Sequence, residues 1–407
     1  MGRLVLSVEK NEGRLVKGGS AGIRVLQVIP SIAKSCGGPS RAVFEIDREL
    51  TALGVSVTIL TTDHEIGDAY GSAAETRSSA SNRIVMPLTT LPYKTSFRMW
   101  AWLRDNVSSF DVVHVHGLFS FAPVAAAWWA KRRGVPYVIR PLGVLNRYGM
   151  ESRRWSKRVS VWLIEGPLLE AAAAIQFTAI AERDEAIEAV GPKSASAIIP
   201  LGIESSAPAP RSMIEERYPT LRGHGYILFM SRVDPKKNLE GLFEALSLAN
   251  ASVRERQLVI CGSGKDEYLK YLKQLSQSFG VDNRIIWAGH VDGEAKVAFL
   301  QHADLFVLPS YSENFGIAAA EAMANGCPVV LGEGVALSKD ASDSSAALVC
   351  TTEARSIADA MERMLSDPVF ASRVALNARH MMREKFSPGI MAKRLLDLYR
   401  AITRSDA

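Results

Sequence analysis

Short apolar runs alternate with amphipathic stretches along most of the chain. In the first half, the runs rich in β-branched residues are 23–29, 55–61, 112–116 and 137–139. Helical patterns separate them, most clearly at 41–53 and 122–133. Buried strands that alternate with helices are typical of a parallel sheet with crossover helices. The pattern therefore predicts the doubly wound α/β class.

The same alternation starts again in the second half. Between the halves, residues 205–212 include Pro208 and Pro210 and lack periodicity, which indicates a linker. The later runs, which we expect to be strands, are 226–230, 257–261, 285–288, 305–308 and 329–330. Helices are expected at 239–249, 267–279 and 295–302. Two similar halves predict two Rossmann-like domains that face a central cleft, with ligands beyond the carboxyl ends of the strands.

The domain boundaries follow from this pattern. Residues 1–22 mix charges and glycines without the long apolar core of a signal peptide, so they are expected to form an N-terminal extension. The first domain is expected over 23–202 and the second over 203–385. Residues 386–407 include apolar positions at helical spacing, which predicts a docked C-terminal helix.

Composition narrows the class of protein. With 47% hydrophobic and 22% charged residues, the chain is ordinary for a globular domain, and disorder is disfavoured. The four cysteines form no C-x-x-C pair, which disfavours a zinc module or a disulfide framework. No apolar run is long enough to span a membrane. We therefore expect a cytoplasmic protein.

Positive charge gathers in one segment, the basic cluster of residues 131–158. It holds nine Lys and Arg residues against a single acid, Glu151, which leaves a local net charge of +8. Such a cluster suits phosphate, an anionic lipid surface or nucleic acid, or is simply a solvated helix face. Nucleic acid is disfavoured because it would leave the motifs described next unexplained.

Two expected loops of the first half carry candidate site residues. Gly37 and Gly38 precede a predicted helix, where adjacent glycines let backbone approach an anion and Ser40 can cap the helix. His116 ends the run 112–116, where an imidazole can orient an acceptor hydroxyl. The alternatives are a plain capped turn and a histidine satisfied by its neighbours.

A pair of cations follows the run 226–230. Arg232 and Lys237 stand five residues apart around Pro235, at the expected end of a buried strand. A planar guanidinium and a compact ammonium suit a diphosphate, and the alternative is an exposed basic turn. Lys237 is expected to be a surface cation whose removal leaves the fold intact.

Two acids stand around the next loop of interest, 310–316. We expect Glu313 to contact a sugar on one side of a diphosphate, and Glu321 to take ribose hydroxyls on the other. The positive end of the helix that follows the loop favours a phosphate. Unpaired acids would repel that phosphate, so Arg232 and Lys237 are expected nearby.

Two further strand ends give weaker signals. Gly262 suits backbone crowding against a ligand or a tight turn, and backbone near His290 can meet a nucleobase edge. The G-x-G-x-x-G fingerprint of dinucleotide dehydrogenases is absent.

Taken together, these residues resemble the retaining glycosyltransferases of the GT-B fold known as family 4. The resemblance covers about 23–402. Its most specific elements are the E-x7-E motif from Glu313 to Glu321 and the pair of Arg232 and Lys237. Residues 140–143 resemble, more loosely, a segment of members that build bacterial polysaccharides.

The resemblance implies a role for each matching residue. Arg232 and Lys237 would bind the donor diphosphate, Glu313 the donor sugar and Glu321 the ribose. The remaining donor-binding positions would be Gly37, Gly38, Gly262, His290, Asn314, Phe315 and Gly316. His116 would face the acceptor and join Glu313, Arg232 and Lys237 in the catalytic set. No D-x-D triplet occurs, so neither a metal nor a cofactor beyond the nucleotide sugar is expected.

The resemblance predicts transfer of a hexose from a UDP- or GDP-linked donor, with retention, to a glycan or polyprenyl-linked acceptor. Cell-surface or exopolysaccharide synthesis is the expected context, with the basic cluster on the inner membrane face. The alternatives are a sugar-nucleotide epimerase of the same fold and a non-catalytic polyanion-binding protein. The sequence identifies neither the sugar, the nucleobase nor the acceptor.

Overall fold

The chain divides into two compact units, which we describe separately. The first is Met1–Gly202 with Pro388–Ala407, and the second is Ile203–Ser387. The first expected boundary coincides with this division, and the second falls after Ser387 rather than after residue 385. The structure, a computed structural model, describes residues 22–33, 38–64, 76–78, 81–90, 92–145, 154–192 and 194–404. The expected extension lies outside these ranges apart from Gly22.

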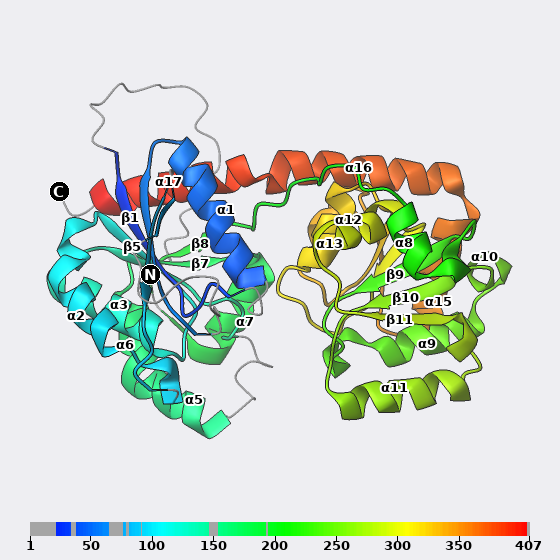
Figure 1. The fold of residues 1–407 in the computed structure, drawn as a ribbon, viewed down its shortest axis with the longest axis horizontal. Coiled ribbons are helices and arrows are strands. Elements are labelled where there is room, and N and C mark those ends of the chain that lie inside the picture. Colours follow the sequence, from blue (N-terminus) through cyan, green and yellow to red (C-terminus); the bar gives the residue numbers. More distant parts are fainter. Residues whose placement is uncertain are drawn as a thin grey trace. The chain divides into compact units, whose positions relative to one another are not determined.

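The first unit is built on an eight-stranded sheet with the order β3-β4-β2-β1-β5-β6-β7-β8 (Figure 1). All pairs are parallel except β3 with β4, which is antiparallel. The strands are β1 (Arg24–Val28), β2 (Ser56–Thr62), β3 (Thr76–Ser78), β4 (Ser81–Met86), β5 (Val112–His116), β6 (Tyr137–Arg140), β7 (Ala174–Phe177) and β8 (Ser196–Ile198).

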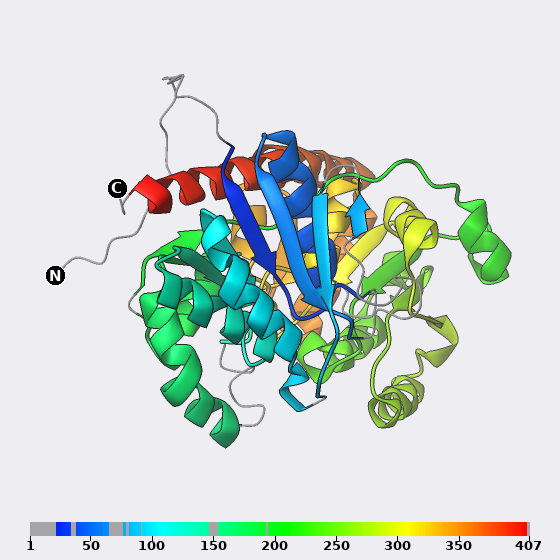
Figure 2. The same cartoon turned by 60° about the vertical axis from the view of Figure 1, so that its left-hand side comes forward.

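Helices cover both faces of this sheet, because neighbouring strand residues point to opposite sides. Leu26 packs with α2 (Phe97–Asn106), α3 (Phe121–Arg133) and α6 (Gly166–Ala171). Val25 packs with α1 (Gly38–Ala52) and the C-terminal helix α17 (Pro388–Arg404), which lie side by side in Figure 2. The expected docked helix is therefore α17, and it belongs to the first unit. The doubly wound prediction is confirmed.

The remaining helical elements of the first unit are shorter or lie at its periphery. They are α5 (Arg154–Ser160), a π-helical turn (Val161–Glu165), α7 (Ile180–Val190) and the 3₁₀ turns Pro92–Lys94 and Val107–Ser109. No helix within the described ranges of the chain combines the length and apolar character needed to cross a membrane.

The second unit has a six-stranded, all-parallel sheet with the order β11-β10-β9-β12-β13-β14. The strands are β9 (Tyr226–Met230), β10 (Gln257–Cys261), β11 (Ile285–Gly289), β12 (Leu305–Leu308), β13 (Val329–Gly332) and β14 (Leu348–Cys350). The helices are α8 (Ser212–Arg217), α9 (Leu239–Leu248), α10 (Ala251–Arg254), α11 (Asp266–Ser278), α12 (Gly293–His302), α13 (Ile317–Ala324), α14 (Ser338–Asp343), α15 (Ala354–Ser366) and α16 (Pro368–Phe386). The 3₁₀ turns are Pro219–Leu221, Pro235–Lys237 and Asp282–Arg284.

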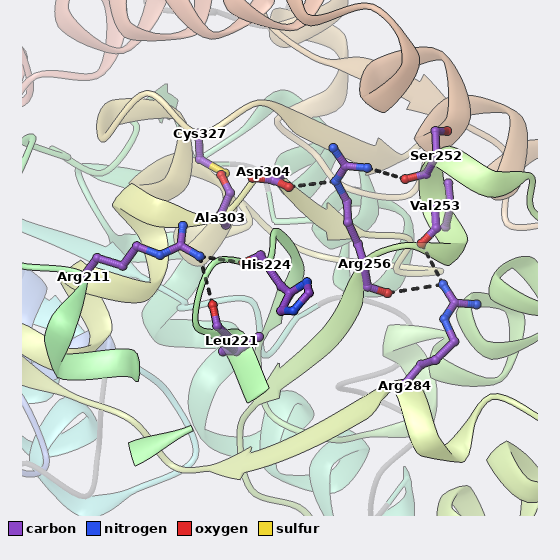
Figure 3. A network of polar contacts seen from close by, with 10 residues as sticks. All are labelled: Arg211, Leu221, His224, Ser252, Val253, Arg256, Arg284, Ala303, Asp304 and Cys327. Atoms are coloured by element: carbon purple, nitrogen blue, oxygen red, sulfur yellow. Dashed lines mark hydrogen bonds and ion pairs between the residues drawn. The ribbon is translucent and has the colours of Figure 1, made fainter. Parts of the chain in front are cut away.

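A network of arginines holds the amino ends of the second sheet (Figure 3). The Arg256 guanidinium forms an ion pair with Asp304 at 2.7 Å, which joins the starts of β10 and β12. Arg284 donates to the carbonyl oxygens of Val253 at 2.7 Å and Arg256 at 3.3 Å. A Cβ at Gly225 would lie 1.8 Å from a carboxylate oxygen of Asp304, so a side chain there would displace the carboxylate from its present position.

A groove of about 630 Å³ lies at the same edge, with Arg256, Asp304, Pro328, Leu376 and Arg379 in its wall. It is therefore at the opposite end of the sheet from the carboxyl ends of the strands.

Each sheet has a switch point, where the strand order changes direction. The switch lies between β1 and β5 in the first unit and between β9 and β12 in the second. Ligands of open α/β sheets bind beyond the carboxyl ends of the strands at this point. His116 ends β5, and the loops after β9 and β12 carry Lys237 and Glu313. The fold thus directs attention to these residues.

Candidate functional site

Lys237 ends the 3₁₀ turn that follows β9, and the turn directs it inward. Asp234 caps the turn by accepting a hydrogen bond from the Lys236 amide at 3.2 Å. Asn238 follows with a φ of 57° and caps α9. Lys237 is only 3% exposed, and its ammonium forms an ion pair with Glu313. The expectation of a surface cation was wrong, because the turn buries this side chain against an acid.

The charges around Lys237 are close to balanced, with a small positive excess. Burial, followed by the cations Lys236 and Arg232, lowers the pKa of Lys237 to about 7, against the opposing effect of Asp234. The contact with Glu313 also opposes this shift, because it favours the charged ammonium. Arg232 is exposed. The basic side chains around Lys237 therefore outnumber the two acids, Asp234 and Glu313, by one. An anion that enters here would be attracted.

The loop that carries Glu313 is held by backbone hydrogen bonds on both sides. The Glu313 amide donates to the Gly334 carbonyl at 2.9 Å, and the Tyr311 amide donates to the Lys236 carbonyl at 2.9 Å. A Cβ at Gly334 would lie 2.1 Å from the Tyr311 carbonyl oxygen, so only glycine fits. The loops after β9, β12 and β13 are thereby fixed to one another.

The end of the same loop starts α13, as the sequence predicts. Gly316 has a φ of 85°, and a Cβ there would lie 2.9 Å from a methyl carbon of Val335. The Phe315 side chain is buried and packs on Phe386 with ring centroids 5.6 Å apart, so only its backbone is left for a ligand. Asn314 is half-buried. The backbone of this loop is thus rigidly placed ahead of the helix N-terminus.

Glu321 has a partner that the sequence did not reveal. It is buried on α13, and the ammonium of Lys296 lies 2.5 Å from its Oε2. Lys296 comes from α12 and is 23% exposed. A pair that joins two different helices leaves no local spacing signal, so sequence reasoning missed Lys296. The ion pair with Lys296 thus holds the buried carboxylate of Glu321 in one orientation.

Gly262 is explained by close packing of protein backbone. Its amide donates to the Gly289 carbonyl at 2.7 Å, and a Cβ would lie 1.8 Å from the Ser231 carbonyl oxygen. The loops after β9, β10 and β11 therefore meet at Gly262. His290 is exposed directly after Gly289.

His116 lies in a buried polar network of the first unit. Its Nε2 is 2.5 Å from Oε1 of Gln27 on β1, and its ring stacks on His114 at 4.3 Å. Tyr399 of α17 completes the network through its hydroxyl, 3.2 Å from Gln27 Nε2 and 2.6 Å from His114 Nδ1. Burial, and then the charges of His114 and Arg140, lower the pKa of His116 well below its usual range. His116 is therefore neutral at physiological pH.

Arg140 is the neighbour of His116 in the sheet, and it is only 2% exposed. Burial lowers its pKa to about 10, and the carboxylate of Glu182 opposes that shift. Glu182 itself accepts hydrogen bonds from the Gly143 amide at 2.9 Å and from the Thr178 amide and hydroxyl at 2.7 and 2.6 Å. Arg140 therefore does not belong to an exposed basic surface, contrary to the grouping of residues 131–158.

The glycine loop of the first unit is described only in part. Gly37 lies outside the described residues, and Gly38 is the first residue of α1. Ser40 does not cap the helix, because it lies inside the first turn and its hydroxyl donates to the Ser31 carbonyl at 3.3 Å. The predicted serine cap was wrong.

The predicted residues thus form groups within each unit. In the second unit Lys237 contacts Glu313, Arg232 lies close enough to affect the pKa of Lys237, and Glu321 pairs with Lys296. His116 and Gly38 belong to the first unit.

Both units match models of known domains. Residues 37–202 match the glycosyl transferase 4-like domain, and residues 214–384 match the glycosyl transferases group 1 domain. An uncharacterized glycosyltransferase of Methanocaldococcus jannaschii is 34% identical over 178 residues, which span 43% of this chain and 44% of that protein. A phosphatidyl-myo-inositol mannosyltransferase of Mycobacterium leprae is 26% identical over 394 residues, which span 94% of this chain and 98% of that protein.

The fold is shared with a solved structure. HepE of Anabaena, in complex with UDP and glucose, superposes with a TM-score of 0.72 at 16% identity and covers 93% of this chain and 100% of its own. At this identity the likeness concerns the fold.

Proposed function

Because the chain belongs to the group 1 glycosyltransferases of the GT-B fold, we propose that it moves a hexose from a UDP- or GDP-linked donor to a glycan or polyprenyl-linked acceptor, with retention. The observation that carries this proposal is the contact of Lys237 with Glu313 between the two loops at the switch point of the second sheet. The complex of HepE with UDP and glucose supports a UDP-linked donor.

In this proposal Lys237 and Arg232 bind the donor diphosphate, and Glu313 binds the donor sugar. A donor phosphate would bind the ammonium of Lys237 and weaken its ion pair with Glu313. A carboxylate oxygen of Glu313 would then be free to accept a hydrogen bond from a sugar hydroxyl. Negative charge grows on the diphosphate as the glycosidic bond breaks, and these cations stabilise it more than they stabilise the intact donor. We propose that they do this without a metal.

On the acceptor side, we propose that His116 contacts the reacting hydroxyl. Its Nε2 is engaged by Gln27, and its Nδ1 is buried without a hydrogen-bond partner, so Nδ1 would make this contact once it becomes accessible to the acceptor. Synthesis of a cell-surface polysaccharide would suit a polyprenyl-linked acceptor at the inner membrane face. The exposed cations of the basic cluster would attract an anionic membrane surface.

The donor proposal is tested by a thermal-shift panel of UDP, GDP, ADP and their common sugar derivatives. A nucleotide at 100 times its dissociation constant adds about 2.7 kcal/mol of stability, so one selective shift is expected. Incubation of the selected sugar nucleotide without acceptor then separates the alternatives, since an epimerase would interconvert the sugar. A protein that none of the nucleotides stabilises would contradict the donor site and favour polyanion binding.

Glu321 is proposed to bind the ribose hydroxyls, with Lys296 holding its carboxylate in place. A hydrogen bond to a charged group contributes about 1.5–3 kcal/mol, so ribonucleotides should bind roughly 10 to 100 times more tightly than their 2′-deoxy counterparts. Lys296→Met is expected to reduce this preference by about fivefold or more, because the carboxylate loses its fixed orientation.

Calorimetric titration of UDP and dUDP, or of GDP and dGDP, measures the preference directly. Lys270→Met is the matched control, because Lys270 is exposed on α11. Equal weakening of both nucleotides by Lys296→Met would indicate a structural role only, and unchanged affinities would remove Lys296 from the site.

A further inference from the structure

The helical stretch 154–165 of the first unit, formed by α5 and the π-helical turn, exposes large apolar side chains. Trp155, Val159, Trp162 and Leu163 are 79%, 52%, 77% and 58% exposed. Their spacing of i, i+4, i+7 and i+8 places them on one side of the helix. In a surface helix this side normally packs on the core. We call these four residues the apolar stripe.

The inward side of the same stretch is polar. Glu165 is fully buried and accepts hydrogen bonds from the Ser160 hydroxyl at 2.7 Å and the Tyr93 hydroxyl at 3.4 Å. Burial, and then the carboxylate of Glu165, raise the pKa of Tyr93. The buried acid therefore fixes the rotation of the helix, and the apolar stripe is held outward by the polar contacts beneath it.

The charges next to the apolar stripe are positive. Residues 154–164 contain no acid, and Lys157 and Arg158 lie between its members. Lys131, at the exposed end of α3, donates to the carbonyl of Pro167 at 3.4 Å, directly beyond the π-helical turn. Arg132 and Arg133 follow it and are exposed. Tryptophan and aliphatic side chains flanked by cations are typical of helices that lie in a membrane interface.

We propose that the apolar stripe is a membrane-docking face that inserts Trp155 and Trp162 among the headgroups of an anionic bilayer. This deepens the membrane contact proposed above and does not depend on the donor site. An anionic surface is favoured over a second copy of the chain, because a symmetric dimer through this face would gather Lys157 and Arg158 of both copies in one interface to which residues 154–164 contribute no acid. On a bilayer the same cations meet lipid phosphates.

Vesicle binding by the full chain tests the docking face without any nucleotide. The wild-type protein should bind vesicles of phosphatidylcholine and phosphatidylglycerol more tightly than vesicles of phosphatidylcholine alone. Trp155→Ser with Trp162→Ser is expected to lower the partition coefficient at least about tenfold, since each change removes a large apolar side chain from the interface. Lys157→Gln with Arg158→Gln should lower it about fivefold per charge. Val369→Ser with Leu376→Ser is the control, because these exposed side chains belong to the second unit.

Tryptophan fluorescence gives an independent readout. The emission of the wild-type protein should shift to the blue on anionic vesicles, as exposed indoles leave water. Trp155→Phe with Trp162→Phe should keep most of the binding and lose the shift, which also shows that loss of binding by the Ser variant is not misfolding.

Several outcomes overturn the proposal. They are absence of vesicle binding, an equal loss in the control variant, and binding that the Ser changes leave intact. A lipid-free dimer that the Ser changes convert to monomer would identify a second copy as the occupant. Tight binding of RNA that vesicles do not compete would identify nucleic acid. Loss of vesicle binding with a normal nucleotide thermal shift separates this proposal from the glycosyltransferase function.

Discussion

Lys237→Met is expected to lower kcat/KM about 10²- to 10³-fold. The ammonium lies at the switch point of the second sheet, buried and in contact with Glu313. A hydrogen-bond donor that points at charge developing in the transition state contributes about 2.7–4 kcal/mol to transition-state stabilisation. Steady-state kinetics with the donor selected by the thermal-shift panel measures the effect. Most of it should appear in kcat, because the leaving group carries more charge in the transition state than in the bound donor.

The same substitution removes the partner of an acid, so stability must be measured alongside activity. Glu313 is 21% exposed, and its isolation is expected to destabilise the second unit by about 1–3 kcal/mol, below the value for a fully buried pair. The double variant with Glu313→Gln leaves no charge unpaired and should recover most of that stability while remaining inactive. Activity that returns with stability would show that Lys237 acts through folding and not on the diphosphate.

The sequence predicted the sheet most accurately where strands are buried on both faces. The bounds of β5, β9, β10 and β12 agree with the predicted runs, because continuous apolar β-branched segments are typical of central parallel strands. It gave no expectation for α15 or α16. Their alternating charged and apolar residues lie between the last predicted strand and the C-terminal helix, where no motif marked a boundary.

The residues of the candidate site could be chosen from their type and position, but their environment could not be predicted. Lys237 and Glu313 were chosen because each follows a predicted strand, and that feature is local in sequence. Burial of Lys237 depends on an acid 76 positions later, and the network of His114 with Tyr399 joins residues 285 apart. Such contacts are set by the tertiary fold. A polar residue in a turn is by default exposed, and this default produced the error over Lys237.

Glu182→Ala is expected to lower the free energy of unfolding of the first unit by about 3–5 kcal/mol. The buried carboxylate accepts three hydrogen bonds, from Gly143 and from the amide and hydroxyl of Thr178, and its negative charge counteracts the lowering of the pKa of buried Arg140 by burial. Its removal leaves buried donors unsatisfied and takes away a negative charge that favours the charged form of buried Arg140, which is among the larger single-residue losses. The Glu182→Gln variant should also be less stable than the wild type. Both carboxylate oxygens of Glu182 accept hydrogen bonds, and the amide NH2 of Gln would place a donor opposite one of those donors.

Tryptophan fluorescence during urea unfolding reports mainly on the first unit, so it measures this change in stability. Six of the seven tryptophans belong to the first unit, and only Trp287 belongs to the second. The two units need not unfold together, so the midpoint of the first-unit transition is the quantity to compare. Glu188→Ala is the control, because Glu188 is exposed on the same helix α7.

If Glu182→Ala unfolds at the midpoint of the control, the bonds to Gly143 and Thr178 add nothing to stability. If it unfolds early, its nucleotide thermal shift should still be normal, because the proposed donor site belongs to the second unit. Transfer to the acceptor should then fall, since the loop that Glu182 holds follows Arg140, which is the partner of His116 in the sheet. That combination would separate the proposed acceptor function of the first unit from the proposed donor function of the second by one buried residue of α7.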